Sequence, residues 1–583
     1  MRSIRRRFTP PFVPAQSTEE DRGRGGKHTA CNTILSTKTI PQVMTSIFSL
    51  SPLDWLALLA FVGAATWYIS HRSRRFPTPP GPRPLPLVGN LFDIPKNNPW
   101  ATYANWSKKY GDIVSVRVPG QTVVIVSSVK AVKDIFDRRG AVYSERPRLP
   151  ILEMIGLYDW LYPLMPTGHR WKAGRRITEQ GMRPAAVQRL HPVLETKAHQ
   201  LLRLLAQDPA AFSDHIKYTT ASTMLLLLYG RDAKTLDDDL LSLGGGLMAV
   251  LSDVALPGAH LVNNIPFLRH LPGWLPGMGF KALAAQGRLM SHRIIHDTYR
   301  HIKGQIENGT AGPCLVRDHL ESIQEKESGV GSLPRDELLI KTSVASIYAP
   351  GSYTTGAALR TLFLALALHP EVQNQAQEEI DRVVGDGRLP TFEDRAALPY
   401  VDAVCKEVLR WKPPSPMSIP HGTAQDDVYE GYLIPKGAVV FGNAWCILHN
   451  PEAYKDPETF NPSRFIDADG SVIDDPNLIY AFGFGRRICP GRHLADSSFW
   501  MFAVSVLFAF RISPAKDDLG REIPLSQEFT DTLISQPKAF KCTIVPRSAW
   551  TRDLVENSED RCAWPRLFAP SRKYIHHIQS DRP

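Results

Sequence analysis

The sequence predicts a mainly α-helical body with a minor β part, preceded by a single membrane helix near the N-terminus. Helical periodicity dominates from about residue 128 to 412. Residues 113–127 have the β-branched alternation of two strands joined by a Pro-Gly turn. Strand and turn patterns return at 415–445 and 520–545, and a mostly apolar run at 47–69 precedes the whole body.

The composition fits a large globular protein that does not bind nucleic acid. The chain has 583 residues, of which 43% are hydrophobic, so a sizeable core can form. Its net charge of +10 is not packed into one stripe and accompanies no nucleic-acid-binding motif. A basic surface suits an acidic membrane face or an acidic protein partner. The seven cysteines include no Cys-x-x-Cys pair, which argues against a disulfide framework or a zinc site and predicts a reducing compartment.

The first 43 residues differ from the rest. Arginines at their start are followed by prolines and by the acidic run Glu19–Asp21. The prolines interrupt any presequence helix, so we predict a disordered basic extension at 1–43. Met44 stands directly before the apolar run, which makes an upstream start site chosen in error the alternative.

A membrane anchor is predicted at 44–70. Asp54 interrupts the apolar run, and the clean part is shorter than the roughly 20 residues that a spanning helix prefers. The basic cluster 71–75 follows, and more basic residues lie close after the run than close before it. This asymmetry predicts a single pass through membrane lipid with the body in the cytosol. A cleaved signal peptide is the alternative, but no small-residue cleavage site follows.

Two further segments flank a predicted catalytic domain at 90–545. Residues 71–89 are rich in proline, which fixes φ and predicts a stiff extended spacer. Residues 546–583 carry mixed charges and few apolar positions. We therefore predict a disordered C-terminal tail or a gene-model extension there.

One cysteine, Cys489, lies in the most informative stretch of the chain. It precedes a Pro-Gly pair and a predicted helix from about Arg492, so its sulfur lies near a helix N-terminus, which favours thiolate over thiol. Arg487 can face an anion on the same side. Gly485 and Gly491 leave bare backbone where a flat ligand would lie. These features suit a haem whose iron takes a cysteine thiolate ligand, and the alternative is a buried structural cysteine.

The surrounding motif resembles the haem-binding signature of the cytochrome P-450 family. The pattern Phe-x-x-Gly-x-Arg-x-Cys-x-Gly is matched at five positions, namely Phe482, Gly485, Arg487, Cys489 and Gly491. The resemblance implies the cytochrome P-450 fold, haem b as the cofactor and Cys489 as the axial ligand of its iron. Together with the motifs that follow, it covers about residues 76–545.

Three residues match family positions that face the haem propionates. Trp171 and Arg175 are four residues apart and therefore lie on one helical face. In the family such a pair points at a propionate, whereas alone it is often a surface cation–π pair. His421 also matches a position that often faces a propionate, and the alternative is an ordinary satisfied polar residue.

A structural network is predicted around a Glu-x-x-Arg pair. Glu407 and Arg410 stand three residues apart on a helix with apolar neighbours, which indicates burial. The segment Phe460–Phe465 resembles the family motif that supplies a further arginine, here Arg464. The resemblance implies that the three side chains hold the cysteine loop against the core and that breaking the network costs haem retention.

The segment Ala349–Thr355 resembles the oxygen-activation segment of the family. A Pro-Gly pair inside a long helix opens the backbone ladder. The resemblance gives Thr354 the hydroxyl that relays protons to bound oxygen. The sequence departs from the family at Tyr353, where an acid is usual, so proton delivery is predicted to use water, Ser352 or Thr355.

The resemblance also implies a substrate pocket and partners. Its predicted lining is Ser415, Met417, Ser418, Ile419, Thr532 and Leu533. The chain has no flavin or nicotinamide fingerprint, so electrons from NADPH are expected through an NADPH–cytochrome reductase, with cytochrome b5 as a further donor. A basic face with Arg486, Arg487 and Arg492 is the predicted dock.

The layout is similar to microsomal, fungal secondary-metabolism members of the family. This similarity predicts a protein of the endoplasmic reticulum membrane that hydroxylates or epoxidises an apolar terpenoid, polyketide or indole-type small molecule. Two alternatives stay open at this point. One is a haem-thiolate isomerase or dehydratase that needs no reductase, and the other is a non-catalytic haem-binding or sensor protein.

Overall fold

The computed structural model describes most of the predicted body and a little of the N-terminal region. The described residues are 51, 53–58, 60, 61, 63, 76–233, 235, 237–255, 260–326 and 333–558. The predicted extension 1–43, most of the predicted anchor and residues 559–583 of the predicted tail lie outside them. The chain divides into two compact units, residues 1–74 and residues 75–583.

In the first unit the described residues form the start of a helix. The Ser51 amide donates to the Asp54 carboxylate at 2.9 Å, and the Asp54 amide donates to the Ser51 hydroxyl at 3.3 Å. This reciprocal pair is a capping box, so Asp54 begins the helix instead of interrupting the apolar run. Among the described residues, no helix combines the length and the apolar character that crossing a membrane requires.

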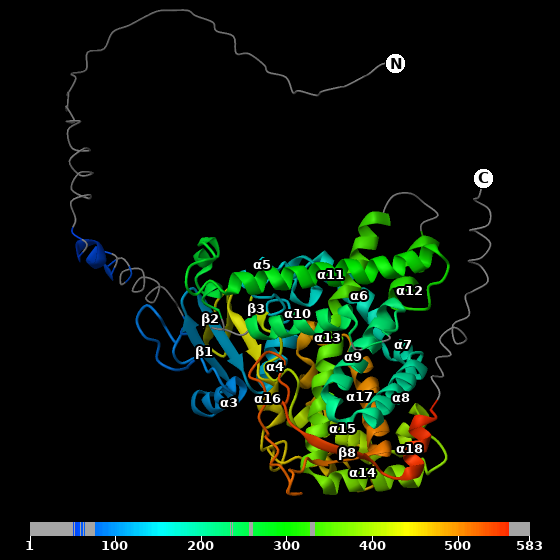
Figure 1. Cartoon of the computed structure of the whole chain (residues 1–583). Coiled ribbons are helices and arrows are strands. Elements are labelled where there is room, and N and C mark those ends of the chain that lie inside the picture. Colours follow the sequence, from blue (N-terminus) through cyan, green and yellow to red (C-terminus); the bar gives the residue numbers. More distant parts are fainter. Residues whose placement is uncertain are drawn as a thin grey trace, which may run out of the picture. The chain divides into compact units, whose positions relative to one another are not determined.

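The second unit is chiefly helical, as predicted (Figure 1). Its longer helices are α3 (Pro99–Tyr110), α6 (His169–Met182), α8 (His191–Gln207), α9 (Phe212–Tyr229), α10 (Asp239–Val254), α11 (Phe280–Glu307), α12 (Leu315–Lys326), α13 (Leu333–Leu368), α14 (Pro370–Val383), α15 (Pro399–Trp411), α17 (Arg492–Ala509) and α18 (Ala549–Glu556). Shorter helices are α4 (Val129–Val132), α5 (Pro150–Ile155), α7 (Pro184–Gln188) and α16 (Ala444–Leu448).

The long helix α13 runs through the middle of this unit (Figure 1). It packs against α6, α9, α10 and α17, and apolar side chains on several of its faces, such as Leu362 and Phe363, are fully buried. Close approach to α9 depends on a small residue, because a β-carbon at Gly351 would lie 2.6 Å from the Met224 methyl group. This buried helix therefore presents its middle turns to the interior of the molecule.

The minor β part is a four-stranded sheet and two hairpins. The strands are β1 (Ile113–Val118), β2 (Gln121–Val126), β3 (His421–Gly422), β4 (Asp427–Tyr429), β5 (Tyr432–Ile434), β6 (Val439–Gly442), β7 (Phe510–Pro514) and β8 (Cys542–Pro546). The sheet order is β1-β2-β6-β3, in which β2 and β6 are parallel and the other pairs antiparallel. The β4–β5 and β7–β8 pairs form the separate two-stranded sheets.

The predicted C-terminal tail begins later than expected. Helix α18 lies inside the segment 546–583, with Thr551 and Val555 buried, and it packs against α8 and α17. Ser548 caps it by accepting from the Thr551 amide at 3.0 Å. The apolar residues at 549–556 are enough for one amphipathic helix, whose Val555 is buried.

Candidate active site

A deep cavity lies where α6, α9, α10, α13 and α17 converge with the loop that precedes α17. Its walls include Cys489 on one side and Thr354 of α13 on another, with Trp171 of α6 and His421 of β3 also in the lining. These residues are far apart in the sequence, so the cavity is a product of the tertiary fold.

Cys489 sits in a tightly held loop. Its amide donates to the Phe482 carbonyl at 2.8 Å, and α17 begins three residues later at Arg492. Burial raises the pKa of the Cys489 thiol, while the Gly491 amide and the charges of Arg175 and Arg492 act in the opposite direction. Burial therefore outweighs the helix terminus, contrary to the sequence expectation. A thiolate at this position needs a cation at the sulfur, and a coordinated metal ion supplies one.

One glycine of the loop is required by a close contact. Gly485 has a φ of 53°. A β-carbon there would lie 2.3 Å from the Phe136 carbonyl oxygen. At Gly491 a β-carbon would lie 3.9 Å from the Cys489 sulfur, which is an ordinary van der Waals distance. Phe482 lines the cavity together with Gly483 and Gly491. The loop therefore presents an aromatic side chain and glycine backbone to the cavity.

A buried arginine beside the cysteine lacks a partner for one of its donors. Arg487 donates from Nε to the Ser144 carbonyl and from Nη2 to the Met165 carbonyl, both at 2.8 Å. Its buried Nη1 has no hydrogen-bond partner. Burial lowers the pKa of Arg487 to about 10. Its guanidinium lies 4.2 Å from the centroid of the Trp171 ring. Because Arg487 is buried, it cannot belong to the predicted docking face for an electron donor, and that part of the prediction is wrong.

A second buried cation, Arg146, lines the same cavity and was missed by the sequence analysis. Its Nε donates to the Pro163 carbonyl at 2.8 Å, and its Nη1 donates to the Ile419 carbonyl at 2.8 Å. Burial, and then the charge of Arg487, hold the pKa of Arg146 well below its usual range. No ion pair among the described residues includes either arginine. In the sequence, Arg146 stands in an ordinary charged loop, so no local signal distinguishes it.

Arg175 of α6 completes the cationic rim. It lines the cavity, donates from Nη1 to the Ile488 carbonyl at 2.8 Å and pairs with Glu179 at 2.7 Å. A thiol, flat apolar walls, an orphaned guanidinium donor and two unpaired buried cations together suit a planar metal macrocycle that carries carboxylates. The residues present therefore fit haem b, which has two propionates.

His421 offers an acceptor to the cavity instead of a donor. Its Nδ1 lies 2.7 Å from the Tyr143 carbonyl, which can only accept, so Nδ1 carries the proton. Burial, followed by the charge of Arg146, holds the pKa of His421 well below its usual value, and the ring is neutral. In this state Nε2 cannot donate to a propionate. The residue lines the cavity and its Nδ1 is satisfied by backbone, whereas the predicted contact with a propionate stays a prediction.

The middle of α13 presents two of the three predicted hydroxyls. Thr354 donates to the Pro350 carbonyl and Thr355 to the Gly351 carbonyl, both at 2.9 Å, and both line the cavity. Ser352 is buried, donates to the Ala349 carbonyl at 3.0 Å and does not line the cavity. The helix turns its side chain away, so it cannot relay protons there.

Four of the six residues predicted to contact the substrate line the cavity. Ser415, Ser418, Ile419 and Leu533 line the cavity. Met417 instead packs against the sheet with Trp100 and Phe441, because the chain turns between Ser415 and Ser418, where the Ser418 amide donates to the Ser415 carbonyl at 3.1 Å. The Thr532 hydroxyl bonds to the Ile534 carbonyl at 2.8 Å, and Thr532 does not line the cavity. Besides Arg146, the lining residues that the sequence analysis missed are mostly apolar and include Met224, Met248, Ile347 and Ile534.

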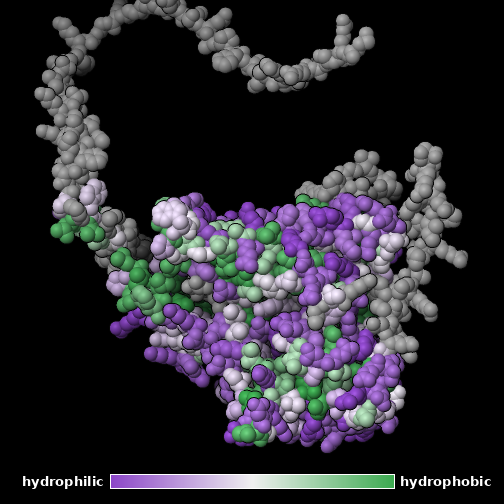
Figure 2. All heavy atoms as spheres, in the orientation of Figure 1, coloured by the Kyte–Doolittle hydropathy of each residue, from purple (hydrophilic) through white to green (hydrophobic). Residues whose placement is uncertain are grey.

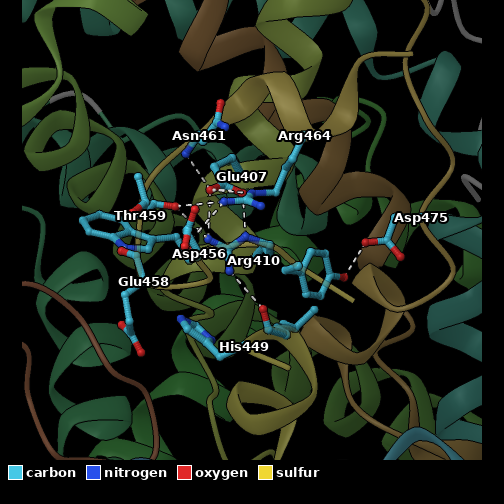
Figure 3. A network of polar contacts seen from close by, with 12 residues as sticks. Glu407, Arg410, His449, Asp456, Glu458, Thr459, Asn461, Arg464 and Asp475 are labelled. Carbon is cyan, nitrogen blue, oxygen red and sulfur yellow. Dashed lines mark hydrogen bonds and ion pairs between the residues drawn. The ribbon is translucent and has the colours of Figure 1, made fainter. Parts of the chain in front are cut away.

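The structure brings Glu407, Arg410 and Arg464 together (Figure 3). Arg410 donates to the two Glu407 carboxylate oxygens at 2.6 and 2.9 Å, and Arg464 donates to one of them at 3.2 Å. Glu407 and Arg410 are completely buried. Arg410 also donates to the Leu448 carbonyl at 3.0 Å. The network therefore ties α15 to the end of α16, and both helices contact the turn Leu478–Phe482 that leads to Cys489.

Comparison with known proteins agrees with this site. The family profile described as Cytochrome P-450 matches residues 79–543. The chain is 41% identical over 492 residues to cytochrome P-450 monooxygenase 208 of Postia placenta, covering 84% of this chain and 94% of that protein. It is 37% identical over 494 residues to cytochrome P-450 monooxygenase COX2 of Coprinopsis cinerea, covering 84% and 93%. It is 39% identical over 504 residues to cytochrome P-450 monooxygenase claR of Ampulloclitocybe clavipes, covering 85% and 91%. The chain therefore belongs to the cytochrome P-450 family and resembles fungal monooxygenases along nearly the whole of its body.

Proposed function

We propose that this protein is a haem-thiolate monooxygenase in which Cys489 ligates the iron of haem b and an apolar, uncharged small molecule is hydroxylated or epoxidised. One observation carries the proposal. Cys489 and Thr354 line the same cavity, and the cations beside it, Arg146 and Arg487, form no ion pair among the described residues, although the charge of Glu145 acts on Arg487. A haem supplies the activation of dioxygen, and the protein supplies its position and surroundings.

Each side chain that matches the family motifs has a separate role in this proposal. The Cys489 sulfur binds the iron, and the bare backbone at Gly491 leaves space around that sulfur. Arg487, with its orphaned Nη1, and Arg146 neutralise the propionates, and Arg175 and Trp171 border them. The Thr354 hydroxyl, which donates to the Pro350 carbonyl at 2.9 Å, would supply a proton at Oγ1 with haem in place, and Thr355 also lines the cavity. Tyr353 is not among the residues that line the cavity.

The cavity supports an uncharged substrate. Once the three arginines meet the propionates, the lining that remains consists chiefly of aliphatic, methionine and aromatic side chains, with the neutral His421 and a few hydroxyls such as Ser415 and Ser418. A carboxylate or ammonium on the substrate would be buried without a partner, which is costly. Terpenoid, polyketide or indole-type secondary metabolites match this lining, and the relatives compared above are all from fungi.

A single-pass anchor in the endoplasmic reticulum membrane, with the catalytic unit in the cytosol, accounts for two exposed apolar regions. In the first unit Leu53, Leu56 and Phe61 are 76, 63 and 71% exposed. Water-exposed helical side chains of this kind indicate a lipid or protein environment. The basic residues of the cluster at 71–75 follow in the sequence and suit the cytosolic side.

The second exposed apolar region lies on the catalytic unit around the turn between β1 and β2 (Figure 2). Leu87 and Phe92 precede β1 and are 84 and 78% exposed. Trp274, beyond the segment that contains Asn264, is 81% exposed. A β-carbon at Gly120 of the turn would lie 4.0 Å from the Asn264 carbonyl, so the segment around Asn264 lies beside this turn. Such a patch suits contact with membrane lipid.

Electrons are expected from an NADPH–cytochrome reductase or from cytochrome b5. We assign the docking of this electron donor to the arginines around the cysteine loop. Arg486 is exposed, and Arg492 donates to the Cys489 carbonyl at 3.4 Å. Arg138 is 79% exposed and lies in a segment that contacts this loop. Positive charge here favours association with an acidic partner and makes it salt-dependent. Unchanged reduction kinetics in an Arg486→Glu variant would contradict this assignment.

The function is tested with membranes that carry the protein, a reductase and NADPH under isotopically labelled dioxygen, with an apolar extract of a fungal culture as substrate. The expected result is a new product that contains one labelled oxygen atom. A product that forms without NADPH and without label would instead show an isomerase or dehydratase. Iron reduction without any oxygen consumption would instead show a haem-binding protein that is not an oxygenase.

A further inference from the structure

A hairpin at residues 528–538 inserts its tip into the wall of the cavity. The hairpin is closed by the Phe529–Pro537 bridge and by the bond from the Thr530 amide to the Gln536 carbonyl at 2.9 Å. At its tip Leu533 and Ile534 are buried and line the cavity. The position of this tip therefore determines the shape of the space that the substrate enters.

Two backbone bonds hold the tip, and any sequence could make them. The Leu533 amide donates to the Ser252 carbonyl at 3.2 Å, and the Ser535 amide donates to the Pro414 carbonyl at 2.8 Å. Neither bond connects the hairpin to α13, the helix that carries Thr354.

The side chain of Gln536 makes that connection. Its Nε2 donates to the Tyr353 hydroxyl at 3.1 Å, and its Oε1 accepts from Arg360 Nη2. Tyr353 and Arg360 both belong to α13, and Arg360 is buried. No ion pair among the described residues includes Arg360, so the Gln536 amide oxygen is a polar partner that this buried guanidinium needs.

The connection joins the two sides of the reaction space. Tyr353 directly precedes Thr354, and Gln536 stands two residues after Ile534. A shift of the hairpin relative to α13 would therefore move the apolar tip relative to the Thr354 hydroxyl. The phenol that replaces the acid usual in the family is thus engaged with the hairpin, and its hydroxyl already accepts a hydrogen bond.

We propose that Tyr353, Gln536 and Arg360 form a latch that sets the position of the Leu533–Ile534 tip relative to Thr354, so that Tyr353 is a positioning residue for the substrate. The inference rests on the proposed function in one respect, namely that the substrate occupies this cavity. The latch itself is a property of the folded chain and can be tested without a substrate.

The first test is hydrogen–deuterium exchange of the full-length holoprotein. Tyr353→Phe keeps the ring and removes the acceptor of the Gln536 amide, and Gln536→Leu removes both bonds. We expect the amides of Leu533 and Ser535 to exchange about fivefold faster in each variant. Gln536→Glu should restore slow exchange, because a carboxylate can accept from both the Tyr353 hydroxyl and Arg360. Tyr432→Phe, in the β4–β5 hairpin, is the matched control and should leave these amides unchanged.

The second test asks whether the latch shapes the space beside the iron. The dissociation constants of imidazole and of 4-phenylimidazole are measured from the haem absorption spectrum. Tyr353→Phe should change the ratio of the two constants by about fivefold, because only the larger probe reaches the tip, while the constant of imidazole stays unchanged.

Three outcomes count against the latch. Unchanged exchange in Tyr353→Phe overturns it even where Gln536→Leu does not fold. Faster exchange with an unchanged ratio of constants overturns its role in positioning. A wild-type protein whose haem spectrum does not respond to imidazole overturns the proposed function itself, and this result is distinct from the other two.

Discussion

At Cys489 opposing influences act on one sulfur atom. Burial raises the pKa of the thiol, whereas the Gly491 amide and the nearby positive charges lower it. The loop therefore holds a sulfur in place without ionising it by itself. Binding of a metal cation changes that balance, since a coordinated thiol loses its proton.

Replacing this sulfur should remove the haem. In Cys489→Ala, the haem bound per protein chain should fall by about tenfold or more, because the iron loses its axial ligand. The measurement is haem absorbance against protein concentration after purification. Cys446→Ala in α16 is the control, since Cys446 is also shielded from solvent but does not line the cavity. Equal haem content in both variants would contradict the assignment of Cys489.

The Thr354 hydroxyl should control how electrons are used. We expect Thr354→Val to lower product formed per NADPH by about tenfold and to raise hydrogen peroxide, because a positioned proton donor is lost. Thr361→Val is the matched control on the same helix, since the Thr361 hydroxyl bonds to the Ala357 carbonyl and does not line the cavity. Unchanged coupling in Thr354→Val would exclude this role.

Single residues differ in how far the sequence predicts them. Phe482, Gly485 and Gly491 were predictable because they belong to one short motif around Cys489 that resembles the family signature, although the close contact at Gly485 is with the distant Phe136. Arg146 was not, because its partners are carbonyls at Pro163 and Ile419 that only the tertiary fold brings near. The orientation of Tyr353 was unpredictable for the same reason, since Gln536 lies 183 positions away.

At the scale of elements, the Glu407 network holds α15 and α16 beside the turn that leads to Cys489. Removing one partner of a buried ion pair leaves the other charge uncompensated. Arg410→Leu should therefore destabilise the fold by about 3–5 kcal/mol. The measurement is the midpoint of thermal unfolding, with haem content followed in parallel. Glu430→Gln, which breaks the exposed pair with Lys130, should leave the midpoint unchanged. A similar midpoint in both variants would refute the structural role.

His449, next to this network, should make stability depend on pH. Burial, and then the charges of Arg410 and Lys412, hold its pKa in the folded chain well below the usual 6.5. As the pH falls below 6.5, the unfolded chain takes up a proton that the folded chain does not bind. This residue therefore contributes stability that is present above pH 6.5 and is lost as the pH falls toward the folded pKa, by at most about 1.4 kcal/mol per pH unit.

The test compares unfolding midpoints at about pH 7 and pH 5. The decrease on acidification should be smaller in His449→Gln than in the wild type. His169→Gln, at an exposed position in α6, should behave as the wild type does. An equal decrease in His449→Gln would show that this ring does not titrate as described.

Helices and strands with a clear hydrophobic periodicity were predicted from the sequence. The pairing of strands that are distant in the sequence was not. The helices and the β1–β2 hairpin follow from periodicity and a Pro-Gly turn. The parallel pairing of β2 with β6, Val123 opposite Val439, joins segments that no local pattern relates. Helix α18 was missed because its apolar positions are few and lie next to a charged C-terminal stretch.

For the whole molecule, two exposed glycosylation motifs test the proposed membrane anchoring and orientation of the catalytic unit. Asn105 and Asn308 begin Asn-x-Ser/Thr sequences, and both side chains are exposed. If the unit faces the cytosol, neither should carry a glycan when the protein is expressed in yeast microsomes. The measurement is a mobility shift on treatment with an endoglycosidase.

A matched control comes from the predicted extension on the other side of the anchor. Ile34→Thr creates an Asn-x-Thr motif at Asn32, which should be glycosylated if that side is lumenal. A glycan on Asn105 or Asn308 would place the catalytic unit in the lumen and reject the predicted orientation.

The two unpaired cations, Arg146 and Arg487, also bear on how the protein is made in a cell. Both arginines are buried, and burial lowers the pKa of each guanidinium. Keeping two charged guanidinium groups there therefore costs free energy in the chain alone. A ligand with two negative charges would reduce that cost. Ligand binding and folding are then linked, and the folded fraction rises with the concentration of the free ligand. Growth of the host with a haem precursor should therefore raise the total amount of soluble protein, and not only the fraction of it that contains haem. The supply of haem in the host should therefore limit the yield of folded protein.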